Sequence, residues 1–108
     1  MTPSTAPTRV AGRYHPRVEA NWMVKVHLGE RIVLVKARDL SMAGLFLHGH
    51  PPDSTQTLTL TLPLPGLGDI TTACTIVRRE AHGVALEFAD LDWDHFLLLA
   101  RYLHPRLP

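Results

Sequence analysis

The sequence predicts an all-β domain with one C-terminal helix, arranged as a six-stranded antiparallel barrel. Three observations predict this fold. Apolar and polar residues alternate along much of the chain, turn-forming residues separate the alternating stretches, and helical spacing of apolar residues is confined to residues 90–104. At 108 residues and 45% apolar content, the chain suits one globular domain. Closing short strands into a barrel also removes exposed strand edges.

Composition sets the expected boundaries. Residues 1–8 carry no charge and no bulky side chain except Met1, so we expect a disordered tail. Residues 9–17 are basic, and Pro16 disfavours a helix at the preceding position, so we expect a loosely held arm. The remaining segments are the barrel, the helix and a short second tail, at 18–89, 90–104 and 105–108.

The first two strands are predicted to form a hairpin. From Trp22 to Leu28, apolar residues alternate with Met23, Lys25 and His27, as in a half-buried strand. Gly29 and the following glutamate suit a two-residue turn, because glycine accepts the positive φ needed at its first position. Residues 31–38 then return as the second strand.

Four more strands follow. The clearest is 55–62, where leucines occupy one face and threonines the other. A turn at 39–44 and a loop at 63–69 separate neighbouring strands, because both contain turn-forming residues. The other three strands are predicted at 45–48, 70–79 and 84–88.

The C-terminal segment is predicted to be the helix. Asp90 or Asp92 can cap its start, Arg101 and His104 suit its last turn, and Pro105 ends it. The apolar residues that share one helical face are expected to dock on the sheet. They are Trp93, Phe96, Leu97, Ala100 and Leu103.

The distribution of charge along the chain favours some classes of function and argues against others. Residues 1–38 carry seven bases and two acids, whereas 39–108 carry four bases and eight acids. This asymmetry predicts a local anion site, and a net charge of +1 argues against a DNA-binding surface. No apolar stretch suits a signal peptide or a membrane helix, so we expect a cytoplasmic protein that is not inserted in a membrane.

Two polar motifs carry the chemistry. Arg13 and Arg17 are four residues apart on the arm, and guanidinium groups bind phosphate oxygens bidentately and stack on purines. The turn contributes Asp39-x-Ser41-x-x-Gly44. Asp39 can accept hydrogen bonds from a guanine edge or hold an arginine, and Ser41 can donate to an oxygen. Gly44 permits a positive φ or a close backbone approach. Together the motifs indicate a guanine-nucleotide site.

These motifs resemble the two-part signature of the PilZ domain. The match continues through Leu45-Phe-Leu and the strand at 83–88 into the helix, and spans roughly 9–104. The resemblance implies a six-stranded barrel that binds cyclic di-GMP, in many members as an intercalated pair of molecules. It also implies a single-domain receptor in the regulation of bacterial motility or biofilm formation.

The resemblance also implies a role for each motif residue. Arg13 and Arg17 would hold phosphates and stack on guanine, Asp39 and Ser41 would meet guanine edges, and Gly44 would shape the turn. The position before the first arginine, often basic or bulky in the family, is Gly12 here. Arg9 is a further candidate contact if the arm folds back.

The leading hypothesis is therefore a cyclic di-GMP receptor. Ligand binding would draw the arm over the barrel and couple the messenger to a downstream protein partner. The alternative is a ligand-independent adaptor of the same fold in motility or pilus assembly. A single-stranded RNA binder is disfavoured, because it needs aromatic stacking platforms and aromatic residues make up only 6% of the chain.

Other reactive residues do not suggest an enzyme, a metal site or a cofactor. His48 and His50, with Asp53 nearby, make a pair at a strand end, but zinc normally needs three or four ligands. Cys74 lies in a predicted strand and is expected to be a small buried apolar residue, not a nucleophile.

Overall fold

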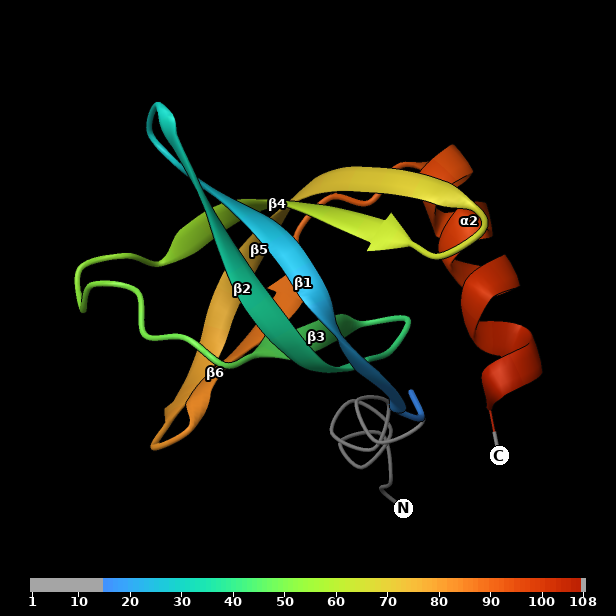
Figure 1. Ribbon diagram of the computed structural model, residues 1–108, viewed down its shortest axis with the longest axis horizontal. Helices are drawn as coiled ribbons and strands as arrows, with labels where there is room; N and C mark the ends of the chain where they lie inside the picture. The colour runs from blue at the N-terminus through green and yellow to red at the C-terminus, as the bar shows by residue number, and fades with distance from the viewer. Residues whose placement is uncertain (1–14, 108) are drawn as a thin grey trace, which may run out of the picture.

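The computed structural model describes residues 15–107, which form a closed antiparallel barrel and one helix (Figure 1). The strand order around the barrel is β1-β2-β3-β6-β5-β4, and all neighbouring strands are antiparallel, which confirms the predicted fold class. The predicted tail 1–8 and arm residues 9–14 lie outside the described residues. The strands are β1 Val18–Leu28, β2 Arg31–Leu40, β3 Gly44–Leu47, β4 Thr57–Leu64, β5 Gly68–Glu80 and β6 Gly83–Phe88.

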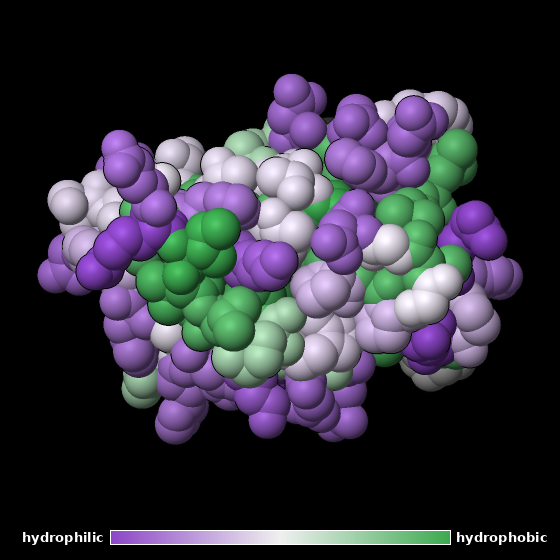
Figure 2. All heavy atoms as spheres, turned by 45° about the horizontal axis from the view of Figure 1, so that its top comes forward, coloured by the Kyte–Doolittle hydropathy of each residue, from purple (hydrophilic) through white to green (hydrophobic). Residues whose placement is uncertain are grey.

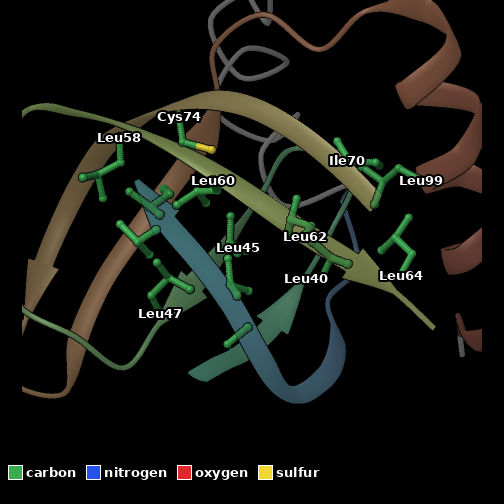
Figure 3. Packing of buried hydrophobic residues seen from close by; sticks show 14 of the residues in the cluster. Leu40, Leu45, Leu47, Leu58, Leu60, Leu62, Leu64, Ile70, Cys74 and Leu99 are labelled. Carbon is green, nitrogen blue, oxygen red and sulfur yellow. The ribbon is translucent and has the colours of Figure 1, made fainter. Parts of the chain in front are cut away.

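Alternation along β4 builds much of the core. Leu58, Leu60 and Leu62 are buried, whereas Thr57 and Thr59 are exposed, as the sequence predicted. Figure 3 shows these leucines pointing into the barrel. Burying a leucine side chain contributes about 1.5–3 kcal/mol, so each of these leucines adds to the driving force for barrel closure.

β1 begins four residues earlier than predicted, at Val18 and not at Trp22. Its pairing with β2 shifts register between Glu19 and Trp22, and Asn21 there has a φ of 55°. Such a bulge breaks the two-residue period on which the sequence prediction depends. Gly29 has a φ of 62° in the next turn, which confirms its predicted role.

The loop predicted at 63–69 is confirmed but is shorter, at 65–67, because β4 continues to Leu64 and β5 begins at Gly68. Pro63 lies within β4, although proline lacks the N–H that a strand ladder uses. The ladder between β1 and β4 involves only Thr59–Thr61 on β4. Pro63 lies beyond that ladder, so its missing N–H removes no bond to β1.

The helix α2 spans Trp93–Leu103, shorter than the predicted 90–104. Asp92 is its N-cap, and its carboxylate accepts a hydrogen bond of 2.8 Å from the backbone N–H of His95. A 3-10 turn, η1 (His104–Arg106), follows and includes Pro105, so part of the predicted tail 105–108 is ordered. No helix in the described part of the chain is long and apolar enough to cross a membrane.

The predicted docking face of the helix is confirmed at Leu103 and wrong at Trp93, Phe96 and Leu97. α2 buries Leu99, Tyr102 and Leu103, whereas Trp93 is 69% exposed and Phe96 and Leu97 are also exposed. The buried face and the exposed face of α2 are both apolar, so the spacing of apolar residues alone does not show which one packs on the barrel. The ring of Trp22 on β1 selects the buried face. It meets Tyr102 edge to face at 6.2 Å, and its indole N–H lies 3.3 Å from the tyrosine hydroxyl.

The two ends of the barrel differ. On the side of α2, Leu64 and Ile70 gather near Leu99 of the helix (Figure 3). Between the β1–β2 hairpin and residues 49–52, an apolar cavity of about 270 Å³ is lined mainly by aliphatic side chains. None of the described motif residues lines this cavity, whose aliphatic walls are those of Val26, Leu28, Val33, Val35, Leu47, Leu58 and Val84.

Cys74 is fully buried on β5, opposite Leu58, as predicted. Burial raises the pKa of its thiol from 9.0 to about 12, because the interior disfavours the thiolate. The residue is therefore not a nucleophile at neutral pH.

Stability should fall at high pH because of this thiol. The unfolded chain ionises the thiol above about pH 9, whereas the folded chain keeps it protonated until about pH 12. Its contribution to the free energy of unfolding is therefore complete below pH 9 and lost as the pH rises toward 12. Urea unfolding at pH 8, 9.5 and 11 measures this loss. A Cys74→Ala variant that loses stability as steeply as the wild type would contradict it.

Candidate ligand-binding site

The Asp39 carboxylate joins two arginines near the end of β2. Arg17 donates from Nη1 to Asp39 Oδ1 at 2.7 Å, and Arg38 donates from Nε to Oδ2 at 2.8 Å. The Asp39 side chain is only 13% exposed, whereas those of Arg17 and Arg38 are 44% and 43% exposed. The carboxylate thus forms the base of the site, and the two cationic groups form its surface.

Arg38 is a site residue that the sequence analysis missed. Neighbouring side chains on a regular strand point to opposite faces, so Arg38 and Asp39 are not expected to meet. The pairing of β2 with β3 shifts register between Ala37 and Asp39, which places Arg38 in a bulge and lets the two side chains approach. The guanidinium carbon of Arg38 also lies 3.8 Å from the centre of the Phe46 ring.

Arg17 lies immediately before β1, and β1 pairs with β2 at Glu19 and Asp39. This pairing brings Arg17 to the turn that follows β2, so one arginine of the first motif lies beside the second motif. The last arm residue is therefore held by an ion pair, in contrast to the loose arm predicted at 9–17. Arg9, Gly12 and Arg13 lie outside the described residues.

Ser41 and Gly44 build the turn that supports Asp39. Ser41 is buried, and its hydroxyl oxygen accepts hydrogen bonds from the backbone N–H groups of Ala43 and Gly44, at 3.1 and 3.3 Å. Its contact with a ligand stays a prediction. Gly44 has no positive φ, but a Cβ there would lie 1.8 Å from the carbonyl oxygen of Leu86 on β6. Close approach to β6 therefore requires glycine at this position.

The charges define what the site can hold. Two guanidinium groups face one carboxylate, so the cluster keeps an excess positive charge at an exposed surface. Exposed ion pairs of this kind contribute at most about 1 kcal/mol to folding, so their main consequence is the placement of the guanidiniums. Within residues 15–107, no group of three potential metal ligands lies close together, at His48, His50 and Asp53 or elsewhere.

The fold and this cluster define a small β-barrel binding domain with a cationic surface site. A family model described as PilZ domain matches residues 12–104, and the chain belongs to the PilZ domain family. The predicted resemblance is thereby confirmed. PilZ domains are binding and adaptor domains. No curated protein matches the chain in sequence.

Solved structures share the fold at low sequence identity. The Bacillus subtilis inhibitor of motility, MotI/DgrA, matches with a TM-score of 0.70 and 19% identity over 85% of this chain. This chain spans only 49% of that protein. The PilZ domain of CeSA from a cellulose-synthesizing bacterium matches with a TM-score of 0.65 and 20% identity, over 82% of this chain and 95% of that one. An uncharacterized Legionella protein matches with a TM-score of 0.55 and 18% identity, over 83% and 96% of the two chains.

Substitution of Gly44 tests the turn. Gly44→Ala should lower the free energy of unfolding by about 3 kcal/mol or more, because the new methyl group meets a backbone carbonyl that cannot rotate away. Gly66→Ala is the matched control, since Gly66 has a φ of 81° but open space around it. Its expected cost is only the backbone strain of about 1–2 kcal/mol. Urea unfolding compares the two, and equal losses would show that the contact with β6 is unimportant.

Proposed function

We propose that this chain is a cyclic di-GMP receptor whose ligand site is the Arg17–Asp39–Arg38 cluster. The observation that carries the proposal is the pair of exposed guanidiniums held by a single, largely buried carboxylate. Membership in the PilZ domain family supports the choice of ligand. Cyclic di-GMP has two phosphates and two purine rings, and guanidinium groups bind both kinds of surface.

Arg17 would bind phosphate. Its bond to Asp39 uses one nitrogen, Nη1, and a guanidinium has five N–H donors in a planar arrangement. The other donors suit a bidentate contact with phosphate oxygens. Both Asp39 oxygens accept bonds from arginines, which supports a role for Asp39 in holding Arg17 and Arg38 in place. Contacts of Asp39 or Ser41 with a guanine edge belong to the same proposal.

Arg38 would add a stacking surface. One face of its guanidinium lies over Phe46 at 3.8 Å, and the group is partly exposed. A planar cation that rests on an aromatic ring can stack its other face on a purine. Arg38 would thereby supply a further cationic contact in a chain that has Gly12 at the position that is basic or bulky in many family members.

The proposal extends to the messenger's effect on a partner protein. Arg13, with Arg9 as a further candidate, would close over the bound ligand from the arm and change the surface presented to a downstream protein. One structural neighbour is an inhibitor of motility, which supports motility as one process in which such a partner acts.

Calorimetric titration with cyclic di-GMP tests the site through Arg17→Ala. Loss of a charge-assisted hydrogen bond costs about 1.5–3 kcal/mol, so the affinity should fall by about 10- to 150-fold. Arg101→Ala is the matched control, because Arg101 is an exposed arginine in the last turn of α2 and should leave the affinity unchanged. Titrations with GTP and cyclic di-AMP measure selectivity.

No heat from the folded wild-type protein would contradict the receptor function and favour the ligand-independent adaptor. Binding that Arg17→Ala leaves unchanged would contradict the assigned site and keep the function.

The same titration tests Arg38 through two variants. Arg38→Ala should weaken binding by about tenfold, through loss of a cationic contact and of stacking. Arg38→Lys keeps the charge and loses the planar group, so it should recover only part of the affinity. Full recovery by lysine would show that charge alone matters, and an Arg38→Ala variant that binds like the wild type would remove Arg38 from the site.

A further inference from the structure

Exposed apolar side chains are concentrated in two places. Seven large apolar side chains of the described residues are exposed, and six of them form two groups of three. The hairpin patch lies on the outer face of the β1–β2 hairpin, and the helix patch lies on α2. Figure 2 shows hydrophobic surface toward both ends of one face of the molecule. The hairpin patch consists of Met23, Ile32 and Leu34, and the helix patch consists of Trp93, Phe96 and Leu97.

The hairpin patch combines apolar and basic side chains in a regular array. Outward-facing cross-strand partners join one apolar and one basic residue in each of three successive pairs. Between Met23 and Lys36, the part of the hairpin that carries this array, Lys25, Arg31 and Lys36 are basic and exposed, and Glu30 at the tip is the one acid. The pairs are Met23 with Lys36, Lys25 with Leu34, and His27 with Ile32.

The apolar run in β2 is typical of a strand that is covered on both faces. Residues 32–35 are continuously aliphatic, as in strands buried on both sides, yet Ile32 is 57% and Leu34 is 58% exposed. A single exposed leucine needs no explanation, but a contiguous apolar patch with a charged rim marks an interaction surface. The hairpin patch therefore has the composition of an uncovered interface.

The helix patch carries the opposite charge. The Trp93 and Phe96 rings stack at 5.4 Å with an angle of 11° between their planes, and form a flat aromatic surface. Three exposed aspartates surround the start of the helix, at Asp90, Asp92 and Asp94, and α2 contains one arginine, Arg101, and no lysine. Tryptophan is enriched at the centres of protein interfaces, where charged residues form the rim.

We infer that the helix patch of one copy docks on the hairpin patch of a second copy of this chain. Each patch has an apolar centre, and the acidic rim of one matches the basic rim of the other. The aromatic pair would lie on the aliphatic outer face of β1 and β2, between Lys25 and Lys36. This contact does not depend on nucleotide binding.

The location of the patches determines the form of the assembly. The hairpin tip and α2 lie toward opposite ends of the long axis in Figure 1. A contact between two different patches is head to tail, so an open chain of copies always keeps one uncovered patch of each kind, and a ring keeps none. The product is a ring or an open chain, whose average mass rises with concentration.

Charge reversal tests this association by sedimentation equilibrium of the full chain. One variant carries Lys25→Glu and Lys36→Glu, and the other carries Asp90→Lys and Asp94→Lys; Asp92 is kept because it caps α2. Each variant alone then has two patches of the same charge and should associate at least about tenfold more weakly than the wild type. An equimolar mixture pairs an acidic helix patch with a basic hairpin patch and should recover association.

Apolar substitutions give a second, independent measurement. Leu34→Ser should weaken association, whereas Val77→Ser should not, because Val77 is exposed on β5 outside both patches. Circular dichroism confirms that each variant is folded. A wild-type chain that stays monomeric at several hundred micromolar overturns the inference and leaves the patches to another partner. A mixture that associates no better than its separate components overturns it as well.

Discussion

The site depends on one carboxylate that binds two guanidiniums. Asp39 can bind Arg38 because β2 bulges there, which brings these two neighbouring side chains together. It can bind Arg17 because β1 starts beside the end of β2, so that Arg17 Nη1 lies 2.7 Å from Asp39 Oδ1. The turn after β2 fixes the backbone at Asp39. The hydroxyl oxygen of Ser41 accepts a hydrogen bond within this turn, and Gly44 lets β3 lie against β6. A small part of the fold, at the junction of the arm, β2 and β3, therefore places two cations at an exposed surface.

Regular alternation made most of the barrel predictable, and local irregularity hid the rest. The leucines of β4 and the turn at Gly29 could be identified from the sequence because each follows a simple geometric rule. Arg38 could not, because its role depends on a bulge that breaks that rule. The early start of β1 was missed for the same reason at Asn21. The buried face of α2 was missed because two of its faces are apolar, and the contact with Trp22 on β1 determines which of them is buried.

Burial of this face of α2 also determines which apolar side chains of the helix remain at the surface. Since α2 buries Tyr102 against Trp22, its Trp93 and Phe96 rings remain exposed beside an acidic first turn. The β1–β2 hairpin, in turn, extends away from α2 to its tip (Figure 1), and the hairpin patch on it is exposed. The proposed nucleotide site and the proposed self-association surfaces thus use different side chains. One small barrel accommodates both without competition between their residues.

The most direct test of the central claim is a double-mutant cycle on Arg17 and Asp39, measured as cyclic di-GMP affinity by calorimetry. If Asp39 acts by placing Arg17, Asp39→Asn weakens binding in the wild type and weakens it much less when Arg17 is already alanine. If Asp39→Asn costs the same factor in both backgrounds, the two residues act independently, and the account of the site as a carboxylate that positions its arginines is contradicted.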